Sequence, residues 1–135
     1  MYSVMREMEF CYGHRLLNYD GKCKHLHGHN GKVVITLEGA KLDDLGMLVD
    51  FADIKKTIKQ WIDDNLDHNL LLCRNDPLLP LLRQQHERVF IMEDNPTAEN
   101  IARLIFDQAV RLELPVTEVA LWETSNCLAA YRKKA

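Results

Sequence analysis

The sequence has 135 residues, the length of one domain, and we expect a single domain over 1–135 with an ordinary hydrophobic core. A formal net charge of −3 gives no reason to expect nucleic acid as a partner, and no apolar run is long enough to cross a bilayer. The four cysteines are irregularly spaced and no signal peptide opens the sequence, so we expect a reduced, cytoplasmic protein without a membrane partner.

The first half of the sequence predicts two strands followed by a helix. Residues 2–12 favour a strand, and alternating side chains predict a half-buried strand over 30–39. After a connection at 39–46, Asp50 can cap a helix over 51–64, because its carboxylate accepts from free backbone N–H groups. The apolar residues of this helix recur at helical spacing: Phe51, Ile54, Ile58, Trp61 and Ile62.

The second half predicts another helix and then two more strands. Prolines interrupt residues 71–95, in which 88–92 favours a short strand and the role of the whole segment stays open. Asn95 or Thr97 can cap the next helix, which continues to about residue 113. Two strands follow, over 116–123 and 127–133. Runs of strands rather than strict strand–helix alternation predict an α+β fold with an antiparallel sheet.

A cluster of imidazoles early in the chain predicts a metal site. Residues 23–29 hold one thiol and three imidazoles, and His14 lies upstream. In an extended segment His27 and His29 point to the same side, while His25 shares that parity and is not separated from them by parity alone. A catalytic zinc takes three protein ligands and keeps a fourth position open, so we predict zinc on His14, His27 and His29. The alternative is a polar loop that binds metal adventitiously.

Three further groups could carry chemistry. The thiol of Cys23 is either the fourth ligand of a closed structural site or a thiolate tuned by a neighbouring cation. The Asp67 carboxylate can orient the imidazole of His68 in a proton relay, or both can be solvated groups at a helix end. Glu123 ends an apolar strand, where a buried carboxylate needs a partner and an exposed one does not.

The motif C-x3-H-G-H, preceded by F-x3-H-R-L, resembles the 6-pyruvoyltetrahydropterin synthase superfamily. Further matching motifs follow in the expected order along the chain: Val49–Lys55, Leu66–Leu70, Pro96–Asn100 and Trp122–Thr124. The resemblance implies a tunnelling fold, with a four-stranded antiparallel sheet and two helices on one face. It also implies assembly into a barrel-forming homohexamer whose sites lie between subunits.

The resemblance also implies roles for the residues that match. His14, His27 and His29 correspond to the zinc ligands. Cys23, Asp67 and His68 correspond to a catalytic relay, and Glu123 to the carboxylate that anchors the pterin. Members of the family usually carry small residues before H-R-L, whereas Cys11-Tyr12-Gly13 stand here. Tyr12 shares strand parity with His14, so we expect its phenol to point toward the site and to bear on substrate identity.

The activity implied by the resemblance is conversion of 7,8-dihydroneopterin triphosphate to 6-carboxytetrahydropterin, with release of acetaldehyde and triphosphate. The short C-x3-H-G-H spacing favours this queuosine branch of the superfamily. The alternative is the biopterin branch, whose reaction ends at 6-pyruvoyltetrahydropterin. An alternative of another class is a non-catalytic, zinc-stabilised oligomeric module, which requires Cys23 to bind the metal.

Overall fold

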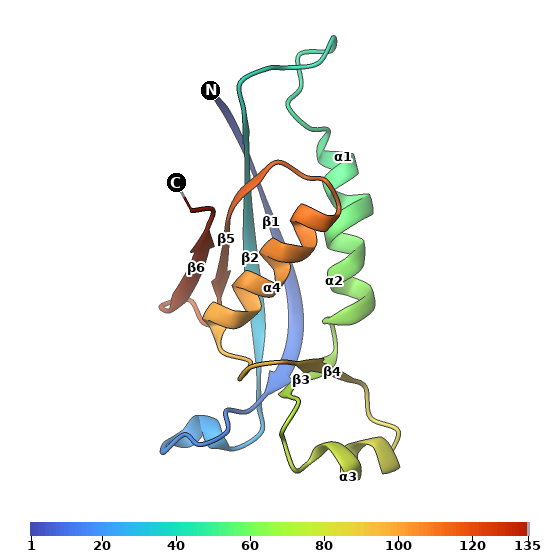
Figure 1. Ribbon diagram of the computed structural model, residues 1–135, viewed down its shortest axis with the longest axis vertical. Helices are drawn as coiled ribbons and strands as arrows, with labels where there is room; N and C mark the ends of the chain where they lie inside the picture. The colour runs from blue at the N-terminus through green and yellow to red at the C-terminus, as the bar shows by residue number, and fades with distance from the viewer. Residues whose placement is uncertain (135) are drawn as a thin grey trace.

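The computed structural model describes residues 1–134. One mixed sheet of six strands runs in the order β4-β3-β1-β2-β5-β6 (Figure 1). Four of its strands form the predicted antiparallel unit: β1 Tyr2–His14, β2 His27–Gly39, β5 Val116–Trp122 and β6 Leu128–Arg132. All four were predicted, β2 and β5 from alternation, and β1 and β2 are longer than expected at the ends that carry the histidines.

The prediction of a four-stranded sheet is wrong by two short strands. β3, Asn69–Cys73, pairs in parallel with the end of β1, and β4, Val89–Met92, pairs in parallel with β3. The strand at 88–92 was predicted, whereas the leucine run of β3 is too short and too uniformly apolar for its period to be read. The short helix α3, Leu79–Gln84, lies between them, so residues 71–95 form a parallel crossover.

The predicted first helix is confirmed as three continuous pieces: α1 Phe51–Ile54, the π-type turn Lys55–Lys59, and α2 Gln60–Asn65. The Asp50 carboxylate caps it by accepting from the Ala52 N–H at 2.9 Å. Ile54, Ile58 and Ile62 are fully buried, as their spacing predicts. Phe51 was expected on the same face but is half exposed, because the first turn projects beyond the core.

The second predicted helix is α4, Ala98–Arg111, and Thr97 caps it by accepting from the Asn100 N–H at 3.1 Å. Asn95, the other candidate cap, instead pairs its amide with the backbone N–H and C=O of Leu17, both at 2.9 Å. Ile101 and Ile105 are fully buried in the core. The helix therefore begins directly beside the segment that follows β1.

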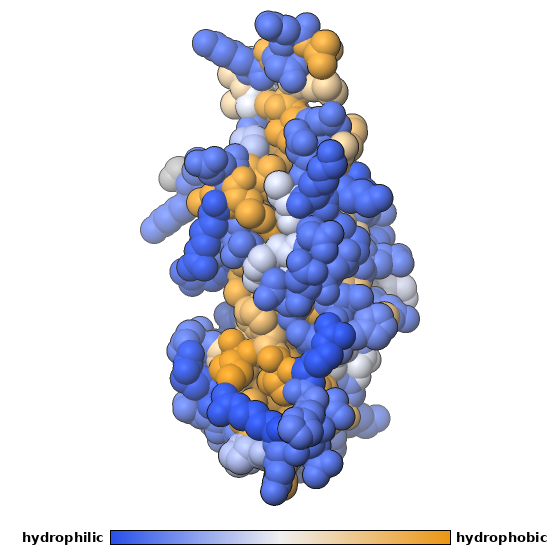
Figure 2. Space-filling view, turned by 90° about the vertical axis from the view of Figure 1, so that its right-hand side faces the viewer, coloured by the Kyte–Doolittle hydropathy of each residue, from blue (hydrophilic) through white to orange (hydrophobic). Residues whose placement is uncertain are grey.

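Both long helices pack against the same face of the sheet (Figure 1). Along β1 the buried residues of this face are Met8, Phe10, Tyr12 and His14, at alternate positions. On the other face Met5 is 61% exposed. The surface over α1 and α2 is largely hydrophilic, and apolar residues gather at the level of β4 (Figure 2). Within residues 1–134, no helix combines the length and apolar character that crossing a membrane requires.

Candidate metal centre

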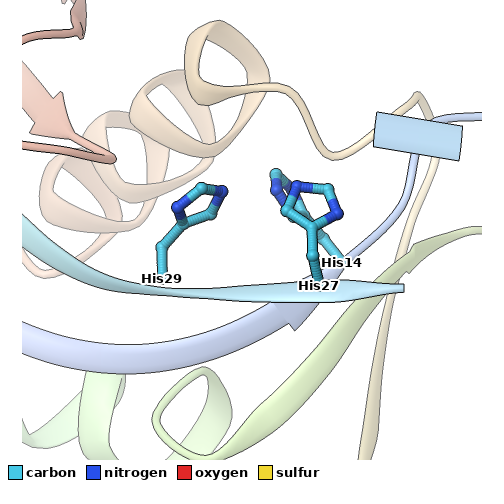
Figure 3. Close-up of side chains that lie close together, drawn as sticks. All are labelled: His14, His27 and His29. Carbon is cyan, nitrogen blue, oxygen red and sulfur yellow. The ribbon is translucent and has the colours of Figure 1, made fainter. Parts of the chain in front are cut away.

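The β1–β2 ladder places the three predicted metal ligands together. In its antiparallel register His14 lies opposite His27, and Tyr12 lies opposite His29. All four side chains stand on the core face, because residues two apart in a strand share a face. Figure 3 shows the three imidazoles facing one another on the side of the ladder covered by α4.

The three imidazoles present nitrogen lone pairs to a common point. Their potential ligand atoms all lie within 4.8 Å of one another. Nδ1 of His14 lies 2.7 Å from the Pro96 carbonyl oxygen, and Nδ1 of His27 lies 2.7 Å from that of His25. A carbonyl can only accept, so Nδ1 of both rings donates and Nε2 carries the lone pair. This arrangement holds a metal-ligating histidine in the right tautomer.

The Nε2 atoms of His14, His27 and His29 are buried and have no hydrogen-bond partner in residues 1–134. Three unpaired buried ring nitrogens converging on one point are costly unless a ligand pairs with them. A divalent cation does so, and three imidazoles suit zinc with an open fourth position. Burial lowers the pKa of His14, which favours the neutral form that a metal requires. The residues therefore fit the ion that the sequence predicts.

The segment that follows His14 is anchored on both sides. The Arg15 guanidinium donates through Nε to the buried Asp76 carboxylate at 2.8 Å. Asn95 holds the backbone of Leu17 at both its donor and its acceptor. Burial opposes ionisation of Asp76, but hydrogen bonds from Arg15 and the Leu78 N–H outweigh it and leave the pKa of Asp76 below its usual value. These contacts keep the His14 end of β1 in place beside α4.

Glu123 lies directly beside the imidazole cluster. Its Oε1 atom is 3.7 Å from Nε2 of His14 and accepts a hydrogen bond from the Tyr12 hydroxyl at 2.9 Å. The side chain is 22% exposed, so it is partly open to solvent. It borders a pocket of about 420 Å³ that also includes Ala98, Glu99 and Cys127. A carboxylate placed here can accept hydrogen bonds from a ligand held next to the cluster.

The Asp67–His68 pair forms, but on the other face of the sheet. Asp67 Oδ2 lies 2.8 Å from Nδ1 of His68, and Asp67 Oδ1 accepts from the backbone N–H of Cys11 at 2.9 Å. Burial opposes ionisation of Asp67, yet these two hydrogen bonds keep its pKa below the usual value. His68 has a left-handed backbone, with φ of 60°, and its side chain is 69% exposed. The ring is therefore oriented by Asp67 and accessible from outside.

The thiol that lies near this pair within one chain is Cys11, not Cys23. The Cys11 sulfur, the Asp67 carboxylate and a His68 ring nitrogen lie within 4.8 Å of one another, and the Cys11 thiol donates to Asn30 Oδ1 at 2.8 Å. No sequence pattern pairs Cys11 with Asp67, because that contact depends on where β3 joins the sheet. Cys11 and His68 border a pocket of about 650 Å³ on the open face.

Cys23 lies in the short 3-10 turn Lys22–Lys24 and is half buried. Within residues 1–134 its thiol belongs neither to the imidazole cluster nor to the Asp67–His68 cluster. One chain thus brings together the three predicted metal ligands and Glu123, and separately the pair Asp67 and His68. It does not bring Cys23 to that pair.

An α+β protein with two helices on one face of its sheet, and a three-imidazole cluster between sheet and helix, is of the tunnelling-fold class. The chain belongs to the 6-pyruvoyl tetrahydropterin synthase family, whose sequence profile matches residues 3–134. It is 39% identical to the 6-carboxy-5,6,7,8-tetrahydropterin synthase of Rickettsia bellii, over 94% of this chain and 97% of that protein. It is 31% identical to the Haemophilus influenzae protein of the same name, over 98% and 100%.

Solved structures agree with the fold. A protein of Wolinella succinogenes, described as uncharacterized, superposes with a TM-score of 0.81 at 27% identity and covers 98% of both chains. The 6-pyruvoyl tetrahydropterin synthase of Caenorhabditis elegans superposes with a TM-score of 0.74 at 22% identity, over 98% of this chain and 96% of that one. The second similarity establishes the common architecture only.

Proposed function

We propose that this protein is a zinc-dependent 6-carboxy-5,6,7,8-tetrahydropterin synthase. It would convert 7,8-dihydroneopterin triphosphate and water to 6-carboxytetrahydropterin, acetaldehyde and triphosphate. The observation that carries the proposal is the set of three buried, unpaired Nε2 atoms on His14, His27 and His29, with a carboxylate beside them. The name shared by relatives up to 39% identical over nearly the whole chain supports the choice of reaction.

The three imidazoles would hold the zinc, and their Nδ1 contacts to Pro96 and His25 carbonyls orient two of the rings before it binds. Bound zinc supplies Lewis-acid polarisation of an oxygen on the substrate side chain. Glu123 would anchor the pterin, because an ionised carboxylate matches a ring N–H and an exocyclic amine as paired donors. The side chain of the pterin then lies toward the imidazole cluster.

Proton movement would fall to Cys23 and the Asp67–His68 pair. Asp67 accepts a hydrogen bond from Nδ1–H of His68, so the lone pair of the ring is on Nε2 and can take a proton from a thiol. His68 is exposed, and the Cys23 thiol is absent from its surroundings within one chain. We propose that a second copy of the chain brings Cys23 to His68, with the site between subunits.

A homohexamer is the proposed assembly. The two edge strands of the sheet, β4 and β6, have no partner on their outer sides within residues 1–134. An open edge is removed when strands of neighbouring copies pair with it, as in a closed barrel. Apolar residues near β4 give that edge a surface suited to burial (Figure 2). Light scattering should give the mass of six chains, and a monomeric mass at micromolar concentration would reject the assembly.

Mixing two inactive variants tests the shared site. Cys23→Ala and His68→Ala each remove one partner of the relay, so each should be inactive alone. If the partners come from different copies, unfolding and refolding the two variants together restores part of the activity, because some sites receive both intact residues. Refolding each variant alone is the control. No recovery in the mixture would place the relay within one chain and reject the shared site.

Product analysis tests the reaction itself. The purified protein, loaded with zinc, is incubated with 7,8-dihydroneopterin triphosphate, and the products are separated and identified by mass spectrometry. The expected products are 6-carboxytetrahydropterin and acetaldehyde. A reaction that stops at 6-pyruvoyltetrahydropterin would support the second candidate, a 6-pyruvoyl tetrahydrobiopterin synthase. That candidate is favoured by the Dictyostelium discoideum enzyme of this name, which is 34% identical over 83% of this chain and 74% of its own length.

A non-catalytic zinc module is the least favoured alternative. It requires a closed site with four protein ligands, and within residues 1–134 the cluster around His14 contains only imidazoles. Three imidazoles would leave a fourth position open on a bound zinc, and this and the partly exposed Glu123 beside the cluster support an enzyme instead.

A further inference from the structure

Tyr12 lies beside the three imidazoles, on the same face of the β1–β2 ladder. It lies opposite His29 in the ladder and two residues before His14. Its ring centroid is 5.2 Å from that of His14 and 5.6 Å from that of His29. The side chain is only 3% exposed. A phenol therefore stands inside the candidate metal centre, in contact with two of its three ligands.

The fold makes specific room for this ring. Phe10 stacks on it with ring centroids 4.9 Å apart. Gly31, which lies opposite Phe10 on the neighbouring strand, leaves room for the ring, because an added Cβ there would lie 2.9 Å from Cε1 of Tyr12 and 3.1 Å from Cδ1 of Leu121. Any larger residue at position 31 would press on the ring. Phe10 and Gly31 thus restrict the position of the phenol ring on two sides.

The hydroxyl points at Glu123. It donates a hydrogen bond to Oε1 at 2.9 Å. The same Oε1 atom is 3.7 Å from Nε2 of His14. A carboxylate is itself a good zinc ligand, and a dication bound to the imidazoles would attract this one. A small rotation of the Glu123 side chain would then close the fourth position.

We propose that Tyr12 is a positioning residue that holds the Glu123 carboxylate off the metal. The hydrogen bond occupies the oxygen nearest the imidazoles and leaves Oε2 free to accept from a ligand. The fourth metal position thereby stays open, and the carboxylate stays available for the pterin. This inference rests on the proposed zinc site and deepens it, because it assigns a task to a residue outside the ligand set and the relay.

Tyr12→Phe tests the inference, since it removes the hydroxyl and keeps the ring that Phe10 and Gly31 enclose. Without the hydrogen bond, Glu123 becomes a fourth ligand. Zinc affinity, measured by competition with a chelator, should rise roughly 10-fold to 100-fold, the size of effect that partners of metal ligands have. Binding of a non-reactive pterin such as sepiapterin, measured by calorimetry on the zinc-loaded protein, should weaken by a similar factor. The visible absorption of the cobalt-substituted protein should change with the ligand set.

The double variant Tyr12→Phe/Glu123→Gln separates the carboxylate from the lost hydroxyl. Glutamine is a poor zinc ligand, so zinc affinity should return to that of the wild type. Tyr19→Phe is the matched control, because Tyr19 is 48% exposed and its hydroxyl has no partner in the cluster, and it should change nothing. Gly31→Ala tests the same hydrogen bond in a second way. The added methyl group displaces the Tyr12 ring from Glu123, so zinc affinity should also rise although the hydroxyl is retained.

Unchanged zinc affinity and an unchanged cobalt spectrum in Tyr12→Phe would overturn the inference. A rise in affinity that persists in the double variant would overturn it as well, because Glu123 would then not be the added ligand. The readouts do not depend on turnover. A wild-type protein that binds zinc but leaves dihydroneopterin triphosphate untouched would therefore reject the proposed function alone, whereas a wild-type protein that binds no zinc would reject both.

Discussion

Zinc should stabilise the folded chain, and the imidazole cluster sets the size of the effect. A ligand that binds only the folded state adds RT ln(1 + [L]/Kd), which is about 4 kcal/mol when free zinc is 1000 times its Kd. For a chain of 135 residues the entropy of unfolding is roughly 0.28 kcal/mol/K. The thermal midpoint should therefore rise by about 14 °C on addition of zinc to the stripped protein. Differential scanning calorimetry measures this shift directly.

His27→Ala should remove most of this stabilisation. The variant leaves two imidazoles, and if its zinc Kd is about 100-fold higher, the same free zinc contributes only about 1.4 kcal/mol, or roughly 5 °C. His25→Ala is the matched control, because His25 offers its backbone carbonyl and not its exposed ring to His27. It should keep the full shift. An equal zinc shift in His27→Ala and the wild type would refute the ligand assignment.

Three further variants test the remaining parts of the site. Cys23→Ala should keep its zinc shift while turnover falls by roughly 10²-fold to 10⁴-fold, as for loss of a general base; loss of metal would support the closed site instead. Glu123→Gln should keep zinc but bind sepiapterin about 30-fold to 1000-fold more weakly, and unchanged affinity in calorimetric titration would show that the pterin is held elsewhere. Asp76→Asn should lower the free energy of unfolding by about 3 kcal/mol, because it leaves Arg15 unpaired. In the wild type the ionised Asp76 contributes to the free energy of unfolding above its unfolded pKa of about 4, and this contribution is lost as the pH falls through its lower folded pKa. Urea titrations should therefore show that the free energy of unfolding falls less on acidification in the variant than in the wild type.

The cluster of three imidazoles could be predicted because its arrangement is largely local. His27 and His29 share a face because side chains alternate along a strand, and this holds for any extended conformation of the segment. His14 required one further condition, a β1–β2 register that places it opposite His27. The position of Tyr12 beside the site followed from the same alternation. The partner of its hydroxyl did not, because Glu123 lies 111 residues away, directly after β5.

The two long helices and the strands β2 and β5 were also predictable, since each has a clear period, while β1 and β6 were predicted from a weaker signal. β3 was not, because a run of leucines has no period that separates a strand from a buried helix. The four-stranded sheet that the resemblance implies does not include β3 or its partner β4. The sequence also left the role of residues 71–95 open. They form a parallel crossover, and Asp76 in this segment binds Arg15, the residue that follows His14.

The sequence by itself determined which residues can bind a metal, which segments become helices or strands, and to which family the motifs point. These depend on side-chain chemistry and on periods of two or 3.6 residues, which are properties of neighbours in the chain. Only the tertiary structure decided that Asp67 and His68 lie beside Cys11 across the sheet from the imidazoles, and that Glu123 is held by Tyr12. Those contacts join segments far apart in sequence, and strand order and register, which no local pattern encodes, bring them together.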